Sequence, residues 1–101
     1  MTIVPFYEKS DIIIYQGNCF DTLPLLNLKF DLVLSDPPYG TTACDWDVMP
    51  DLDKLWLELK RIGKDKTAYV MTASQPFTSK LVMSNLKEFK YCWYWHKNRP
   101  T

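Results

Sequence analysis

The feature that most constrains the fold of this chain is a near-continuous apolar run from Phe30 to Ser35, which is followed closely by two consecutive prolines. A strand with one solvated face alternates apolar and polar residues, whereas a strand covered on both faces is apolar almost throughout. The run therefore predicts an inner strand of a parallel sheet. Because Pro37 and Pro38 fix their own φ angles and bias the preceding residues towards extended conformations, we expect a stiff turn after this strand.

The rest of the chain alternates short β-branched or aromatic runs with amphipathic segments. Further strands are predicted at residues 11–15, 68–72 and 91–96. Helices are predicted at residues 21–28, at 52–62 with Asp51 as N-cap and Gly63 as the stop, and after Ser74. Strands that alternate with helices favour an α/β fold of one domain, in which helices flank a mostly parallel sheet of about four strands.

The composition favours a globular protein over a membrane or metal-binding one. Hydrophobic residues make up 47% and charged residues 24% of the chain, and no uninterrupted apolar run is long enough to span a bilayer. The first residues lack the basic and apolar regions of a signal peptide, so we expect a cytoplasmic protein with no membrane contact. Three scattered cysteines and one histidine support neither a disulfide framework nor a metal site.

Charge is distributed unevenly along a chain that is neutral overall. Residues 1–53 hold two bases and nine acids, for a net charge of −7, while residues 54–101 hold ten bases and three acids, for +7. This asymmetry is compatible with a basic face for a polyanion such as DNA. Charge alone, however, favours the alternative of solvated helix surfaces.

The turn after the first apolar strand carries groups that suit one kind of ligand. In an open α/β sheet, ligands bind beyond the carboxyl ends of the strands, which is where Asp36 lies. Its carboxylate and the Pro37 carbonyl are two convergent acceptors, which match an exocyclic amine with two N–H donors. Tyr39 can stack on the base that carries this amine, once the base has left the double helix. The alternative is a plain turn in which Tyr39 only packs.

The tetrapeptide Asp36-Pro37-Pro38-Tyr39 after a hydrophobic strand resembles the catalytic motif of S-adenosylmethionine-dependent DNA amino-methyltransferases. Other segments resemble the phage-associated members of this family, some of which serve restriction-modification. These segments are Tyr15–Cys19, the loop Asp36–Asp47, Ala73–Ser79 and Trp95–Thr101. The resemblance spans nearly the whole chain and implies a partial Rossmann-like methyltransferase fold.

The resemblance also implies a reaction, a cofactor and a partner. A methyl group would move directly from S-adenosylmethionine to an amine of a base flipped out of double-stranded DNA, without a metal. Asp36 and the Pro37 carbonyl would orient the amine, Pro38 would set the turn and Tyr39 would hold the base. Asp at the first position of the motif favours the N6 amine of adenine, and the N4 amine of cytosine is the alternative. The resemblance assigns Asn18, Cys19 and Asp36 to cofactor binding, although Asn18 equally fits a plain turn residue. Tyr39 is assigned to DNA binding. Thr41 and Thr42 follow the motif directly and are expected to line the target channel, with loop-capping hydroxyls as the alternative. Lys97 and Arg99 are expected to contact phosphates, with a solvated strand end as the alternative.

The chain also departs from the family pattern. Asn18 stands where an acidic residue normally contacts the cofactor, and no Gly-x-Gly loop occurs. We therefore expect residues 1–101 to be the catalytic part of a methyltransferase domain, without the target-recognition region or the glycine-rich cofactor loop, and inactive in isolation. A non-catalytic remnant and one half of a split enzyme completed by a second chain are the alternatives. An aromatic strand at residues 91–96 would leave an exposed edge, which predicts self-association, for instance as a homodimer.

Overall fold

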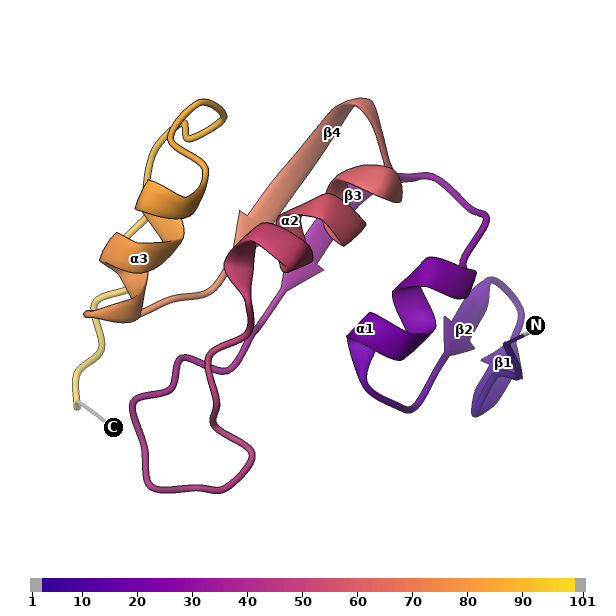
Figure 1. Cartoon of the computed structure of the whole chain (residues 1–101), viewed down its shortest axis with the longest axis horizontal. Helices are drawn as coiled ribbons and strands as arrows, with labels where there is room; N and C mark the ends of the chain where they lie inside the picture. Colours follow the sequence, from indigo (N-terminus) through magenta and orange to yellow (C-terminus); the bar gives the residue numbers. More distant parts are fainter. Residues whose placement is uncertain (1–2, 100–101) are drawn as a thin grey trace.

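The computed structural model describes residues 3–99, which form a mixed α/β structure with two small sheets (Figure 1). The strands are β1 (Tyr7–Lys9), β2 (Ile12–Ile14), β3 (Phe30–Ser35) and β4 (Gly63–Met71). The helices are α1 (Cys19–Thr22), the 3-10 helix η1 (Leu23–Leu25), α2 (Leu52–Arg61) and α3 (Phe77–Ser84). None of the helices in residues 3–99 is long and apolar enough to cross a membrane.

The centre of the structure is a β–α–β unit formed by β3, α2 and β4. The two strands are parallel, with Leu32 opposite Ala68 and Ser35 opposite Met71, which confirms the predicted parallel pairing. Helix α2 starts as predicted, since the Asp51 carboxylate caps it by accepting the Lys54 backbone N–H at 3.2 Å. The helix also ends before Gly63 as predicted. β4 begins at once, several residues before the predicted start.

The close return of β4 explains why glycine stands at position 63. A Cβ there would lie 1.8 Å from the Tyr69 hydroxyl oxygen and 2.9 Å from its ring carbon Cζ, so any side chain would collide with this ring. Gly63 thus ends α2 and also leaves room for the Tyr69 ring, which comes from the same strand, β4.

The core lies between α2 and one face of this sheet. Val33 from β3 packs with the α2 stripe of Leu55, Leu59 and the cap residue Ile62, all of which are buried. The N-terminal elements close the side of this cluster, because Arg61 donates to the backbone carbonyls of Leu23 and Leu26. These contacts tie η1 to the end of α2.

The opposite face of the sheet is uncovered, so the expectation that both faces of the apolar strand are buried is wrong for residues 3–99. Leu32 is 56% exposed, Leu34 69% and Val70 49%. The reason is that α3 does not cross to this face. It packs against α2 instead, where the Trp56 indole N–H donates to the Ser84 hydroxyl at 2.9 Å.

Two further predictions about strands are corrected. The strand at residues 12–14 pairs antiparallel with β1, and does not join β3 and β4. Residues 91–96 form no strand, although Tyr91 and Trp93 stack with ring centroids 6.3 Å apart. Within residues 3–99 this segment pairs with none of the four strands, so its backbone groups enter no ladder. The observed sheets are therefore both two-stranded, and a four-stranded Rossmann-like sheet remains a prediction.

The N-terminal helical segment also differs from the predicted helix at residues 21–28. It begins at Cys19, because the Asn18 side chain accepts the Phe20 backbone N–H at 2.9 Å and caps it. It tightens into a 3-10 turn that contains Pro24 and ends at Leu25.

Candidate functional site: the loop after strand β3

Asp36 lies where the two parallel strands end together. The ladder between them continues to the Thr72 backbone N–H, which donates to the Ser35 carbonyl at 3.0 Å. The Thr72 hydroxyl donates to Oδ1 of Asp36 at 2.5 Å, and the Tyr39 hydroxyl approaches the same oxygen at 3.5 Å. Within residues 3–99 the second carboxylate oxygen, Oδ2, accepts no hydrogen bond from the protein. The carboxylate is thus oriented through one of its two oxygens.

Tyr39 is fixed by the third helix. Its ring stacks on Phe77, with centroids 5.0 Å apart and planes inclined by 18°. Phe77 is the first residue of α3 and is completely buried. Since a buried aromatic ring supports one face of Tyr39, the orientation of the tyrosine is set by the packing of α3.

The loop between β3 and α2 is closed by Asp47. This side chain is 8% exposed and accepts four hydrogen bonds. Its Oδ1 takes the Gly40 N–H at 2.9 Å, while Oδ2 takes the Thr41 N–H at 3.1 Å, the Thr42 N–H at 2.8 Å and the Thr42 hydroxyl at 2.6 Å. The Thr42 hydroxyl, followed by the Gly40 N–H, lowers the pKa of the Asp47 carboxyl from 3.8 to about 2. Asp47 therefore holds this loop as an anion.

Gly40 allows this closure. Its φ of 72° lies in the left-handed region, and a Cβ there would approach the Met49 backbone nitrogen to 3.2 Å. The two ends of the segment from Gly40 to Met49 therefore meet, and the loop is a compact Ω-like structure.

The loop borders an open hollow of about 400 Å³. All four residues of the Asp-Pro-Pro-Tyr motif line it, together with both predicted DNA-binding threonines. The complete lining is Asp36, Pro37, Pro38, Tyr39, Thr41, Thr42, Trp46 and Asp47. The structure thus brings six of the predicted site residues into one pocket and adds Trp46 and Asp47.

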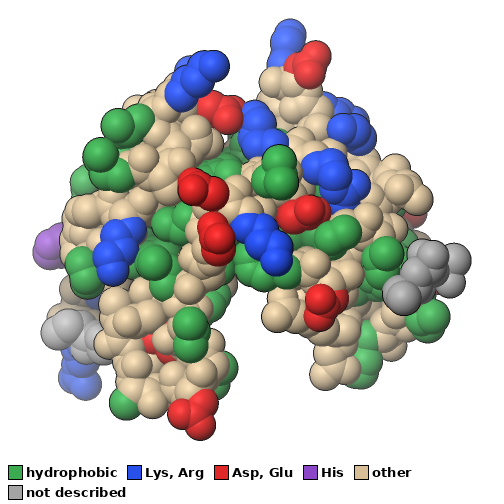
Figure 2. Space-filling model, viewed as in Figure 1, with side chains coloured by type: hydrophobic (Ala, Val, Ile, Leu, Met, Phe, Trp, Pro, Cys, Tyr) green, Lys and Arg blue, Asp and Glu red, His purple; other side chains and the backbone are tan. Residues whose placement is uncertain are grey.

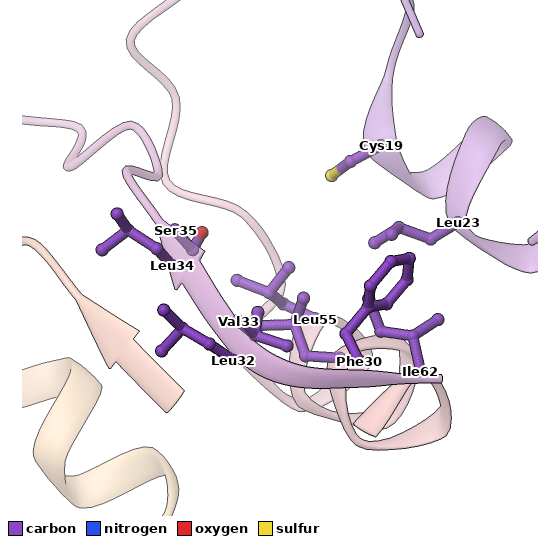
Figure 3. Close-up of a pocket in the computed structure, with 10 residues that line it drawn as sticks. Cys19, Leu23, Phe30, Leu32, Val33, Leu34, Ser35, Leu55 and Ile62 are labelled. Atoms are coloured by element: carbon purple, nitrogen blue, oxygen red, sulfur yellow. The ribbon is translucent and has the colours of Figure 1, made fainter. Parts of the chain in front are cut away.

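The predicted cofactor residues are not brought together in the same way. Cys19 lines a second hollow of about 330 Å³ beside β3, where Figure 3 shows its sulfur projecting from α1 towards this space. Apart from Cys19 and Ser35, the residues that line this hollow are aliphatic or aromatic. Ser35 is the residue directly before Asp36 in the chain. The Asn18 side chain lines neither hollow and is engaged as the cap of α1.

The predicted phosphate contacts, Lys97 and Arg99, lie in the segment after α3 and line neither hollow. Figure 2 shows lysine and arginine side chains interspersed with aspartate and glutamate over the visible face, without a single-sign surface. Among residues 3–99 no group of His, Cys, Asp and Glu is arranged to hold a metal ion.

Sequence reasoning missed three residues of the site. Thr72 follows β4, and its contact with Asp36 depends on the register of the parallel pair. Asp47 and Trp46 lie within the loop, where a tryptophan close to a turn predicted to bind a ligand could have been a signal.

Comparison with protein-family models, curated proteins and solved structures found no match to this chain.

Proposed function

We propose that this chain carries the base-binding and amine-orienting part of a DNA amino-methyltransferase. The observation that carries the proposal is the single pocket formed by the motif Asp36–Tyr39 with Thr41 and Thr42. Its volume suits a nucleobase, and it combines an anionic acceptor with an aromatic ring. The pocket therefore offers both kinds of contact that a flipped base needs.

The residues of the pocket would act on the amine in a defined way. Thr72 and Tyr39 occupy one oxygen of Asp36, so the other oxygen can accept one amine hydrogen. No hydrogen bond within residues 3–99 reaches the Pro37 carbonyl, which can accept the second. Accepting both hydrogens draws the nitrogen towards tetrahedral geometry and frees its lone pair. On methyl transfer, the nitrogen would form the new C–N bond as the methyl–sulfur bond of the donor sulfonium breaks, the donor would leave as a neutral thioether, and the nitrogen would release one of these protons towards Asp36.

S-adenosylmethionine would supply the methyl group in this reaction. The second hollow offers apolar surface for part of such a molecule, but its polar lining is limited to Cys19 and Ser35. It has no carboxylate for ribose hydroxyls and no charged side chain for the amino-acid end. The described residues thus fit an apolar part of the cofactor only, and we propose that a complementing chain or a second copy supplies the remainder.

The target is proposed to be the N6 amine of adenine, with the N4 amine of cytosine as the alternative. The test compares short single-stranded oligonucleotides that carry either adenine or purine, which lacks the amine. We expect wild type to bind the adenine probe about tenfold more tightly, since hydrogen bonds to a charged group contribute roughly 1.5–3 kcal/mol before solvent screening. Asp36→Ala should remove this preference, whereas Asp45→Ala, an exposed acid of the same loop outside the pocket, should keep it.

Equal binding of both probes by the wild type would contradict the proposal for adenine. If a cytosine probe were instead preferred over one lacking its amine, and Asp36→Ala removed that preference, the cytosine alternative would be supported.

A further inference from the structure

Trp46 is placed differently from the other exposed tryptophans. It lines the motif pocket although 73% of its surface is exposed. Trp93 and Trp95 are even more exposed but line neither hollow. An indole held open to water beside an acceptor-lined pocket leaves a large flat surface unpaired, and such surfaces stack well on nucleobases.

The backbone around Trp46 is fixed on both sides. The Asp47 N–H donates to the Cys44 carbonyl at 3.0 Å, and the Val48 N–H donates to the Trp46 carbonyl at 3.0 Å. The Asp47 side chain also accepts hydrogen bonds from Gly40, Thr41 and Thr42, and so anchors this turn to the segment that directly follows the motif. The backbone that carries the indole is therefore tied to one buried carboxylate.

We infer that Trp46 is a second stacking surface for the base in the motif pocket, and that Asp47 is the residue that positions it. This inference rests on the proposed function and extends it to residues outside the Asp-Pro-Pro-Tyr motif. The base would be held by two aromatic side chains with separate supports. The Tyr39 ring stacks on the buried ring of Phe77, and the backbone at Trp46 is held by the hydrogen bonds that the neighbouring Asp47 side chain accepts from the loop.

The two aromatic surfaces and the carboxylate have different consequences for selectivity. Stacking on Trp46 is available to any base, because every base has a π-face. The amine contact at Asp36 is available only to a base with an exocyclic amine. Trp46 should therefore raise affinity for all bases equally, while Asp36 sets the preference among them.

The experiment measures fluorescence anisotropy of a labelled single-stranded oligonucleotide that carries adenine or purine. Trp46→Ala should weaken binding of both probes by about 5- to 140-fold, the range for one lost base–aromatic stack. Trp46→Phe should recover most of this loss, because a smaller ring can still stack. Trp93→Ala, which removes an indole that is 86% exposed outside both hollows, serves as the matched control and should bind like wild type.

Asp47→Asn tests the positioning role. The amide keeps the size of the side chain but presents an N–H₂ group where one oxygen now accepts a backbone N–H, so the loop loses at least one hydrogen bond. We expect Asp47→Asn to weaken binding of both probes and to keep the adenine preference. The double variant Asp47→Asn/Trp46→Ala should bind little more weakly than Trp46→Ala alone.

Photocrosslinking with a 5-iodouracil oligonucleotide, followed by peptide mapping, provides a second readout. Attachment at Trp46 or Tyr39 is expected. If Tyr39→Ala weakens binding while Trp46→Ala does not, the inference about Trp46 is wrong and the proposed function stands. If neither variant changes binding and crosslinks occur only outside the pocket, both fail. If Asp47→Asn leaves binding intact, its positioning role is refuted.

Discussion

Replacing Phe77 with leucine probes the link between the packing of α3 and the site. Phe77 is completely buried and stacks on Tyr39 at a centroid distance of 5.0 Å. Leucine keeps an apolar side chain but loses the aromatic pair, worth about 0.5–1.5 kcal/mol, and leaves part of the ring volume unfilled. We therefore expect the free energy of unfolding to fall by about 2 kcal/mol, which lowers Tm by roughly 8–16 °C for a domain of this size.

Thermal unfolding followed by circular dichroism measures this change, and oligonucleotide anisotropy at a temperature where the variant remains folded measures the effect on the site. Because Tyr39 loses its support, base binding should weaken even in the folded variant. Leu57→Ala, at an α2 position that is 70% exposed, is the control and should change the free energy of unfolding by less than about 0.5 kcal/mol. A Phe77→Leu variant with unchanged Tm and unchanged binding would refute the reasoning, since it would show that Tyr39 does not depend on this ring.

Three further predictions concern the loop, the core and the exposed aromatics. Because the pKa of Asp47 is lowered from 3.8 to about 2, its contribution to loop closure is complete above about pH 4 and lost as the pH falls through about 2; the amide resonances of Gly40 and Thr42 should titrate with that midpoint by NMR, and should not do so in Asp47→Asn. The Tyr69 hydroxyl is buried without a hydrogen-bond partner among residues 3–99, so Tyr69→Phe should raise the unfolding free energy by about 1 kcal/mol in a denaturant melt, and a lower value would indicate a partner for this hydroxyl. The segment around Trp93, which is 86% exposed, should cause concentration-dependent association in sedimentation velocity, and Trp93→Ser should reduce it; a monomer at all concentrations would contradict this expectation.

Much of the candidate site follows from local sequence. Two adjacent prolines after an apolar strand determine a stiff turn through the φ angles they fix, so the sequence pattern is enough to assign Asp36 and Tyr39 to one pocket. The partners of these residues could not be assigned. Thr72 contacts Asp36 only because β4 pairs with β3, and Phe77 supports Tyr39 only because the start of α3 lies against the motif; such long-range contacts leave no local pattern.

The contacts of Asp47 also could not be predicted from the sequence, although its partners lie in the same loop. Its sequence neighbourhood identifies an ordinary acidic loop residue, and the four hydrogen bonds that bury it depend on the positive φ of Gly40 and the close approach of Met49. Three backbone N–H groups converge on one carboxylate only after the loop has closed. The depressed pKa follows from that convergence and not from the residue type.

The sequence by itself determined the elements that rely on local rules: the apolar strand β3, the capped helix α2, the glycine that ends it and the proline turn that carries Asp36. Tertiary structure decided which faces were covered and which strands paired. The same apolar run predicted burial on both sides, yet Leu34 is 69% exposed because α3 packs on α2. The hydrophobic pattern of a sequence indicates which side chains favour burial. Which element covers them depends on contacts between segments that are far apart in the chain.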